Sequence, residues 1–323
     1  MNRTVFKSVF AEEINEYLDE KLRSGYCEKS FYYHLKGFDR FCSDNDLGTK
    51  EFNQALADKW VKLRLAEAST THYSRINAIK WFLIFLRNKG YQIRVTNNIA
   101  FKPTDFKPHI YTKDEICRYF DAVDRFDSSQ NKRTKIQYPL LFRLLYCCGT
   151  RINETLGIRK GDVELEAGII KLFEVKNNCE RYIVLNEELL DLMQQYANKT
   201  FYLLSEEDYI FRSARDSRCH GDTVYEHHRL ILKQAGIPYI GDGKGPRVHD
   251  WRHTFAVTSF KQMIDQGLDM YVALPILSTY LGHKTIYATE KYVRLTMEIY
   301  PFIEERFKDK MDAVFGEVSH EGD

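Results

Sequence analysis

Five residues between positions 151 and 292 carry side chains suited to chemistry on phosphate esters. Arg151 comes first, His249 and Arg252 follow, and His283 precedes Tyr292 by nine residues. Guanidinium groups can fork onto phosphate oxygens, imidazoles can move or donate protons, and a phenol oxygen can attack as a nucleophile. The set therefore predicts covalent chemistry at an anionic phosphate, with a tyrosine as the attacking group.

The spacing of these residues predicts where each side chain points. His249 and Arg252 are three residues apart, so on a helix they share a face and can reach one anion together. Arg151 follows Gly149, which reads as the end of a helix, with Thr150 placed to cap the next one. An arginine there lies beside free backbone N–H groups, which favour an anion.

His283 and Tyr292 are predicted on either side of a turn. Leu281-Gly282 is typical of a helix end and sets His283 at a turn, and residues 284–291 leave room for a second helix that carries Tyr292. No spacing rule selects this tyrosine over its neighbours. The local competitors are Tyr280, Tyr287 and Tyr300.

Each of these residues also has an ordinary structural interpretation. Arg151 could pair with Glu154 or Glu164 on the surface, and an isolated His-x-x-Arg occurs by chance in many proteins. His253 precedes Thr-Phe-Ala-Val, which favours a hydrogen-bonded histidine in the core. The functional interpretation depends on finding all the residues together.

Apolar residues recur at helical spacing in the first ninety residues. Four stripes are spaced by three and four, around Ile14, Phe38, Trp60 and Ile79. Four short amphipathic helices can close a small bundle. Residues 95–110 contain Pro103 and Pro108 without clear periodicity, which indicates a linker.

The remainder of the chain predicts a mainly α domain with a small antiparallel β-sheet. Thr112 and Glu115 fit a capping box that opens a helix. Two β-rich runs, 168–175 and 181–185, predict a hairpin, and 209–211 is a candidate third strand. The expected domains are 1–94, the linker 95–110, a catalytic domain 111–301, and a C-terminal amphipathic helix with an acidic tail at 302–323.

Net charge is +1 for the chain, but the charge is unevenly spread. Residues 1–110 carry an excess of five positive charges, and residues 302–323 an excess of four negative ones. Affinity for DNA depends on where the cations lie, so a near-neutral total permits a DNA-binding groove. Composition is permissive of a nucleic-acid partner and does not demand one.

Cysteine usage and hydropathy point to a cytoplasmic protein. The seven cysteines form no Cys-x-x-Cys pair, which is typical of reduced thiols, and Cys219-His220 lacks a second pair that would complete a metal site. No run of 18 apolar residues and no N-terminal apolar segment are present, so we expect neither a membrane span nor secretion. We expect no metal and no cofactor.

The motifs as a group resemble the tyrosine recombinase (phage integrase) family. "GTRINETL" resembles the family's first arginine box, "VHDWRHTFA" its second, and "LSTYLGHKTIYATEKYVRL" its last. These three boxes and the lysine of the predicted hairpin stand in order at family spacing, and the four together are specific, although each alone is weak. Trp251 stands where an aliphatic residue is commoner, and Asn153 where serine is frequent. The N-terminal helices also resemble the family's core-binding domain, so the resemblance covers nearly the whole chain.

The resemblance implies a site-specific DNA recombinase or integrase that cuts and rejoins strands through a 3′-phosphotyrosine, without metal or ATP. Arg151, Arg252 and His283 would stabilise the phosphate, with Glu154 supporting Arg151, and Tyr292 would be the nucleophile. His249 would act as general base, and Lys176, in the predicted hairpin turn, as general acid. Lys171, within the strand, is the weaker candidate for this lysine.

The resemblance also implies a double-stranded DNA partner with a specific recombination site, and a tetramer on that DNA. The C-terminal helix would dock on a neighbouring protomer or on its own domain. The run "ALPILSTYLGHK" resembles integrases of mobile elements. Candidate DNA contacts in the fourth N-terminal helix are His72, Arg75 and Lys80. The alternatives are a type IB topoisomerase-like enzyme and a DNA-binding regulator with an inactive core.

Overall fold

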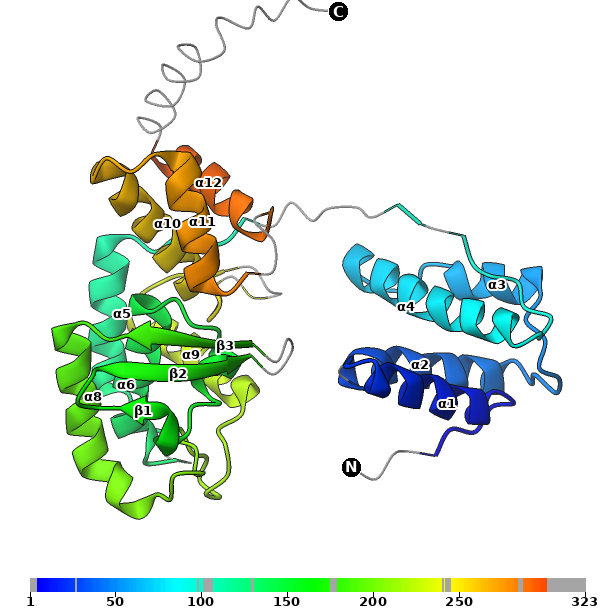
Figure 1. Cartoon of the computed structure of the whole chain (residues 1–323), viewed down its shortest axis with the longest axis horizontal. Helices are drawn as coiled ribbons and strands as arrows, with labels where there is room; N and C mark the ends of the chain where they lie inside the picture. Colours follow the sequence, from blue (N-terminus) through cyan, green and yellow to red (C-terminus); the bar gives the residue numbers. More distant parts are fainter. Residues whose placement is uncertain are drawn as a thin grey trace, which may run out of the picture. The chain divides into compact units, whose positions relative to one another are not determined.

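The chain divides into two compact units, residues 1–106 and 107–323, which are described separately (Figure 1). The structure is a computed structural model that describes residues 5–26, 28–97, 99–100, 107–128, 131–174, 179–239, 241, 245–283 and 287–300. Within these ranges the side chains of 28–30, 174, 179, 287–288, 290–291 and 293–294 are outside the description. Among the described residues, no helix is both long and apolar enough to cross a membrane.

The first unit is a bundle of four helices, as the apolar stripes predict. Its core is aromatic: the fully buried ring of Phe38 lies within 6.2 Å, centroid to centroid, of Phe10, Phe52, Trp60 and Phe82. Burial of such rings supplies most of the driving force for a bundle this small. The helices are α1 (Ala11–Arg23), α2 (Glu28–Asp44), α3 (Gln54–Val61) and α4 (Ser69–Asn88).

The second unit combines helices with a three-stranded antiparallel sheet of order β1-β2-β3, which confirms the predicted fold class. The helices are α5 (Lys113–Arg125), α6 (Thr134–Cys147), α7 (Ile152–Thr155), α8 (Glu187–Thr200), α9 (Gly221–Gln234), α10 (Asp250–Asp265), α11 (Met270–Leu281) and α12 (Tyr287–Ile299). The strands are β1 (Val163–Glu164), β2 (Ile169–Glu174) and β3 (Cys179–Val184), with short 3₁₀ turns at Lys160–Asp162 and Phe201–Leu203.

The predicted hairpin is present, but the expected third strand is wrong. β2 and β3 pair from Ile169 opposite Val184 to Glu174 opposite Cys179. β1, at Val163–Glu164, occupies the remaining edge of β2. Tyr209 forms only an isolated bridge with Arg159, because the chain near it runs past the sheet without continuing a ladder.

Local signals fix several helix starts. The Thr112 side chain accepts a hydrogen bond from the Glu115 amide and Glu115 returns one to the Thr112 amide, so the predicted capping box of α5 is confirmed. Thr150 does not cap α7, contrary to expectation. Its hydroxyl instead pairs with that of Thr155, and Arg151 occupies the N-cap position.

Two packing arrangements hold the helix that carries His249 and Arg252. The ring of Trp251, fully buried, stacks on Tyr111 at 3.8 Å with an interplanar angle of 2°. The Tyr111 amide donates to the Thr254 hydroxyl, one turn along α10. The segment that enters the second unit is thus fastened to α10.

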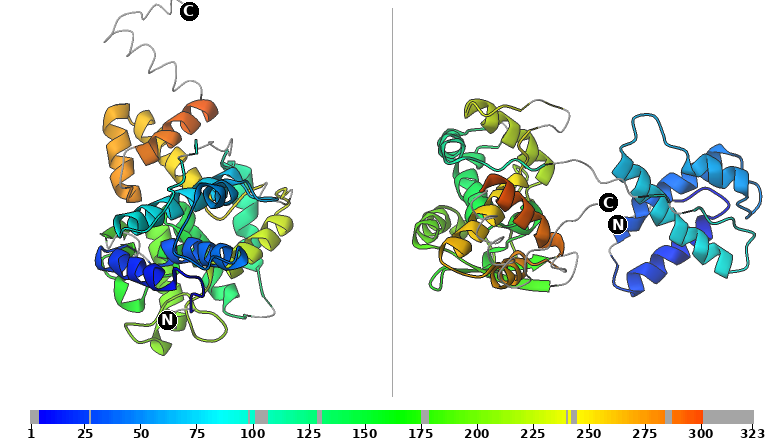
Figure 2. Two further views of the ribbon diagram at one scale, coloured as in Figure 1. Left: turned by 90° about the vertical axis from the view of Figure 1, so that its right-hand side faces the viewer. Right: turned by 90° about the horizontal axis from the view of Figure 1, so that it is seen from above.

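Helices α10, α11 and α12 form a second, smaller core at one end of this unit (Figures 1 and 2). Ala256, Phe260, Leu277 and Leu281 are buried there together with Tyr292. The unit therefore brings α12 against α10, and the tyrosine against the helix that carries the second arginine.

Candidate active site

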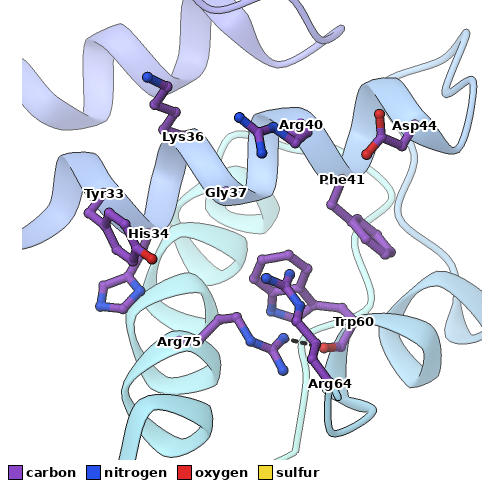
Figure 3. A pocket seen from close by; sticks show the side chains of 10 residues that line it. All are labelled: Tyr33, His34, Lys36, Gly37, Arg40, Phe41, Asp44, Trp60, Arg64 and Arg75. Carbon is purple, nitrogen blue, oxygen red and sulfur yellow. Dashed lines mark hydrogen bonds between the residues drawn. The ribbon is translucent and has the colours of Figure 1, made fainter. Parts of the chain in front are cut away.

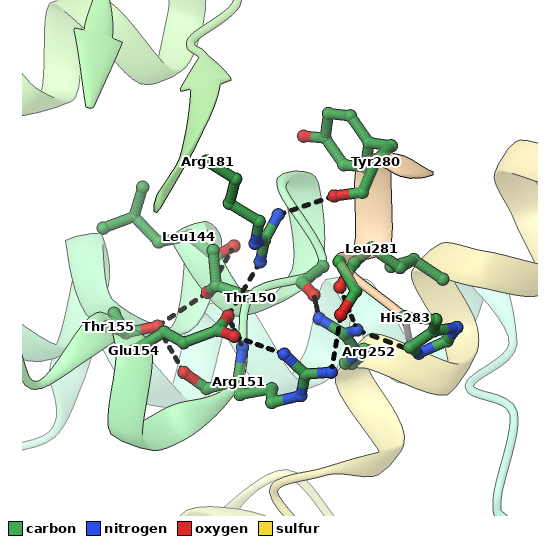
Figure 4. A network of polar contacts seen from close by, with 12 residues as sticks. Leu144, Thr150, Arg151, Glu154, Thr155, Arg181, Arg252, Tyr280, Leu281 and His283 are labelled. Atoms are coloured by element: carbon green, nitrogen blue, oxygen red, sulfur yellow. Dashed lines mark hydrogen bonds and ion pairs between the residues drawn. The ribbon is translucent and has the colours of Figure 1, made fainter. Parts of the chain in front are cut away.

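Glycines shape the two turns that present the site. Gly149 ends α6 with φ of +57°, and a Cβ there would lie 2.3 Å from the Phe255 ring, so only glycine fits. Arg151 follows two residues later at the start of α7. Gly282 ends α11 with φ of +66°, and His283 comes directly after it. Both turns release a side chain from a helix end into the same region (Figure 4).

Arg252 is the most enclosed of the predicted residues, with 1% of its surface exposed. It donates to the Gly149 carbonyl at 2.7 Å and to the Leu281 carbonyl at 2.6 Å, so it joins both turns. Burial, followed by the charge of Arg151, lowers the pKa of Arg252 to about 10. The guanidinium therefore stays positive at neutral pH.

Arg151 and Glu154 form an ion pair, as predicted, and Glu154 also accepts from the Arg151 amide. The carboxylate is buried, and its second partner is Arg181, whose guanidinium donates to it at 2.7 Å. Burial would raise the pKa of Glu154, but Arg181 and Arg151 outweigh it and the pKa is lowered. Glu154 is thus a carboxylate shared by two arginines.

His283 lies between Arg252 and the helix of the tyrosine. Its Nε2 lies 3.1 Å from Arg252 Nη2, and its Nδ1 lies 2.8 Å from the Thr289 hydroxyl. Because a guanidinium can only donate, Nε2 accepts in this arrangement and Nδ1 carries the proton. A phosphate that replaced the imidazole as the acceptor for Arg252 would free Nε2 to bind a proton of its own.

Tyr292 reaches this cluster from α12. It is 1% exposed, and its ring runs parallel to the His283 ring within 5° at a centroid distance of 6.0 Å. Burial raises the pKa of Tyr292, while Arg252 and Arg151 oppose that shift. The nucleophile candidate and both arginines therefore meet within one unit of one protomer.

His249 is connected to the tyrosine through a second histidine, His253. Its ring contacts that of His253 at 4.8 Å, and His253 in turn contacts the Tyr292 ring at 5.4 Å. His253 is buried, as expected of a core histidine, but it also borders the phenol. Sequence reasoning did not place His253 in the site, because its position on α10 gives no signal beyond burial.

Lys176 lies outside the described residues, as does the C-terminal segment 302–323. Lys171, the weaker lysine candidate, is described: it forms an ion pair with Glu180 across the hairpin at 2.8 Å. Within the described ranges, no group of three or more histidine, cysteine, aspartate or glutamate side chains is arranged to hold a metal ion.

Arg181 contacts the cluster but was not among the site residues predicted from the sequence. It was predicted only as part of a strand, yet it contacts both Glu154 and the Tyr280 carbonyl. No sequence spacing connects residue 181 with 154 or 280, because the contact arises from how β3 packs against α7 and α11. Only the fold reveals it.

The expected DNA contact at Arg75 in the first unit does not agree with its burial. The side chain of Arg75, which is 4% exposed, forks onto the Glu67 carboxylate at 2.7 and 2.8 Å. Its guanidinium also donates to the Trp60 carbonyl (Figure 3). It therefore braces the loop between α3 and α4. His72 is half-buried and its Nε2 donates to the Val61 carbonyl, and Lys80 is half-buried on α4.

A pocket beside Arg75 carries cations that are exposed. Lys36 and Arg40 project from one side of α2, with Gly37 between them, and Arg64 lies over the Trp60 ring at 5.1 Å (Figure 3). All three cations are exposed. Sequence reasoning missed them because it looked for cations on α4.

The chain is similar to known proteins over most of its length. The sequence model of the phage integrase family matches residues 110–298, which is more than half of the chain. The putative integrase/recombinase y4rB of Sinorhizobium fredii is 25% identical, over 94% of this chain and 99% of that protein. Tyrosine recombinase XerC of Staphylococcus saprophyticus is 25% identical, over 86% of this chain and 90% of that protein.

The fold is also similar to that of solved structures. A λ integrase tetramer bound to a Holliday junction matches with a TM-score of 0.58 and 17% identity, over 88% of this chain and 78% of that chain. At this identity the similarity concerns the fold.

Proposed function

The chain belongs to the phage integrase family and is a site-specific DNA recombinase, and we propose that Tyr292 is the residue it uses to cut and rejoin DNA. One observation carries this proposal: the buried Tyr292 ring lies parallel to the His283 ring at 6.0 Å, and His283 Nε2 in turn lies 3.1 Å from Arg252 Nη2. Two guanidiniums beside a buried phenol leave a phosphodiester as the natural substrate for the site.

In the proposed cleavage step the Tyr292 oxygen attacks the phosphorus, and the bond from phosphorus to the 5′-oxygen breaks. Arg151 and Arg252 stabilise the charge on the nonbridging oxygens, as does His283 once its Nε2 carries a proton. The phenol loses its proton to a base, for which the family resemblance supplies His249. The leaving 5′-oxygen gains a proton from Lys176, also assigned by resemblance.

Religation is the reverse of the cleavage step. The 3′-phosphotyrosine keeps the energy of the phosphodiester, so a 5′-hydroxyl from a second DNA can attack it without ATP. The same residues then act in the opposite sense, with Lys176 accepting a proton and Tyr292 leaving as the phenol. We propose that no cofactor takes part.

The partner is double-stranded DNA that carries a specific recombination site. Lys36, Arg40 and Arg64 are exposed together on the first unit, and such cations bind DNA phosphates. We propose a tetramer on DNA, by analogy with the λ integrase assembly. The setting is the cytoplasm, and the DNA belongs to a mobile element, as the resemblance to integrases suggests.

Covalent trapping tests the proposal. Protein is incubated with genomic DNA of the source cell, adducts are isolated in denaturant, and the attached 3′-ends are sequenced. A duplex with a nick close to the mapped cleavage point should then accumulate adduct. Cleavage releases the short strand that carries the 5′-hydroxyl, and without this hydroxyl the strand cannot be rejoined. Binding of that duplex without any adduct would identify an inactive regulator instead.

A two-site assay separates recombination from relaxation. Two labelled duplexes that carry the mapped site should exchange strands and yield recombinant products. A type IB topoisomerase-like enzyme would relax a supercoiled plasmid and leave the two duplexes unexchanged. That pattern would contradict the proposed recombination.

A further inference from the structure

The C-terminal end of α11 is held by three arginines from three different elements. Its last carbonyls, consecutive in the chain, each accept a hydrogen bond from a different guanidinium (Figure 4). The donors and distances are Arg181 to Tyr280 O at 2.7 Å, Arg252 to Leu281 O at 2.6 Å, and Arg151 to Gly282 O at 3.3 Å. Carbonyls at a helix end have no partner within the helix, so they suit cationic donors.

Arg181 shares a second partner, Glu154, with Arg151. Its Nη2 donates to Glu154 Oε2 at 2.7 Å, while Glu154 Oε1 is held by Arg151. One buried carboxylate thus connects Arg181 with Arg151. Arg181 bridges this carboxylate and the end of α11 with its two Nη groups.

The stem of Arg181 also packs tightly against the turn that carries His283. A Cβ on Gly282 would lie 3.1 Å from Arg181 Cδ, closer than nearly all real contacts of this kind. The Arg181 side chain is only 14% exposed. The turn at Gly282 and the arginine therefore fix each other's position.

Arg181 reaches the site from the sheet. It lies on β3 opposite Leu172 of β2, whose side chain is buried in the main core. The strand is anchored by that core, so the guanidinium is delivered from a rigid element. A support with such an anchor can hold a site to within the fraction of an ångström that catalysis needs.

We propose that Arg181 is a positioning residue for strand cleavage: it locks Glu154 to the end of α11 and thereby holds Arg151 and His283 in register around the scissile phosphate. The inference rests on the proposed function. It assigns Arg181 no contact with DNA, since its two Nη groups already bind Glu154 and Tyr280. The effect is transmitted to the groups that stabilise phosphate charge.

A second explanation for slower cleavage by an Arg181 variant involves the proposed general acid, Lys176. Lys176 precedes Arg181 by five residues in the sequence, so loss of Arg181 could also slow cleavage by displacing the proposed general acid. The two explanations make opposite predictions for modified substrates. A methylphosphonate at the scissile position lacks the anionic oxygen that the arginines stabilise, and a bridging 5′-sulfur leaves without needing a proton.

The test is single-turnover cleavage of the nicked duplex by Arg181→Ala, with wild type measured on each substrate. On the ordinary phosphate we expect a loss of about 10–100-fold. On the methylphosphonate most of the deficit relative to wild type should disappear, whereas on the 5′-sulfur substrate it should persist. The cleavage rate of Arg181→Lys should lie between those of wild type and Arg181→Ala. Its single ammonium keeps the charge but cannot bridge both acceptors as the guanidinium does.

Two further variants keep the result interpretable. Glu154→Gln combined with Arg181→Ala should lose less than the product of the single losses, because both changes break one connection. Arg118→Ala is the matched control, since Arg118 binds Asp114 and the carbonyls that follow α9, at residues 235 and 236, away from this cluster. It should cleave like wild type.

The possible results distinguish a failure of the proposed role of Arg181 from a failure of the proposed function. No adduct with wild-type protein would refute the proposed function itself. If wild type forms adduct, three results would each overturn the role of Arg181: wild-type cleavage by Arg181→Ala, rescue of this variant by the 5′-sulfur, or strictly multiplicative losses in the double variant.

Discussion

At the scale of single residues, two opposing effects set the state of the Tyr292 hydroxyl. Burial raises its pKa, while the charges of Arg252 and Arg151 lower it, and burial prevails. The phenol is therefore protonated at neutral pH in the DNA-free protein. Cleavage then requires a base, and the His253 ring, which contacts that of His249, lies 5.4 Å from the Tyr292 ring.

The substitution Arg252→Lys tests whether this arginine acts as a fork or as a charge. Lysine keeps the charge, but a single ammonium cannot span the carbonyls of Gly149 and Leu281 as well as the phosphate. We expect single-turnover cleavage to fall by about 10²–10³ with little change in DNA affinity. A cleavage rate near that of wild type would show that the charge alone suffices.

The proposed acid role of Lys176 has its own chemical test. Lys176→Ala should cleave an ordinary site poorly, because the 5′-oxygen leaves only with a proton. With a bridging 5′-sulfur at the scissile position, the variant should approach wild type on the same substrate. Persistence of the defect would count against proton donation by this lysine.

The placement of site residues was predictable from the sequence where they follow a glycine that ends a helix. Gly149 and Gly282 mark the turns that expose Arg151 and His283, so the sequence located both. Arg181 was not predictable, because its partners are distant in the chain. For Arg75, the sequence could not distinguish a DNA contact from a structural role, whereas the structure buries its guanidinium against Glu67.

At the scale of elements, α10 depends on the aromatic stack between Trp251 and Tyr111. Trp251 is fully buried, and its ring also contacts those of Tyr119 and Phe120. We expect Trp251→Ala to lower the free energy of unfolding by about 3–5 kcal/mol, as a cavity replaces a large ring. Urea unfolding followed by circular dichroism measures this value.

The control for that measurement is Tyr202→Ala, which removes a ring that is 76% exposed in the same unit. Its effect should be within about 0.5 kcal/mol. A similar small change for Trp251→Ala would mean that α10 is held by other contacts.

A buried histidine on α9 should make the second unit sensitive to acid. Burial lowers the pKa of His228 to about 3, and its Nδ1 pairs with the Tyr119 hydroxyl at 2.6 Å. An unfolded histidine titrates near ~6.5, so between these pH values the unfolded state binds more protons. The stability that depends on neutral His228 is therefore complete above pH ~6.5 and is lost as pH falls towards 3.

As the pH falls below ~6.5, we expect the free energy of unfolding to decrease. The contribution of His228 to this decrease is at most about 1.4 kcal/mol per pH unit. His228→Asn keeps an acceptor for Tyr119 but does not titrate. The variant should be less stable at neutral pH and lose less stability than wild type on acidification. Parallel loss in both proteins would assign the acid sensitivity to other groups.

The elements themselves were largely predictable from periodicity and capping. The stripes around Ile14, Phe38 and Ile79 became α1, α2 and α4, because each stripe had an aromatic core to bury against. The edge strand was not predictable: β1 has two residues, too short for any alternation to show. Residues 209–211 have the composition of a strand but pair with a loop.

At the scale of the whole molecule, DNA binding should depend on the exposed cations of the first unit. We expect Lys36→Ala with Arg40→Ala to weaken binding of the mapped duplex and to reduce the slope of log affinity against log salt by about two. Fluorescence anisotropy across a salt series gives both quantities. Lys59→Ala, on α3 outside the pocket that these residues line, is the control. An unchanged slope in the double variant would place the DNA elsewhere.

The most direct measurement of the account is the chemical identity of the protein–DNA bond. Adduct trapped on the nicked duplex is digested with protease and nuclease, and peptide mass spectrometry locates the residue that carries the nucleotide 3′-phosphate. We predict that the modified peptide contains Tyr292, that Tyr292→Phe yields no adduct, and that Tyr287→Phe and Tyr300→Phe retain it. A nucleotide on any other residue, or adduct from Tyr292→Phe, would contradict the central claim.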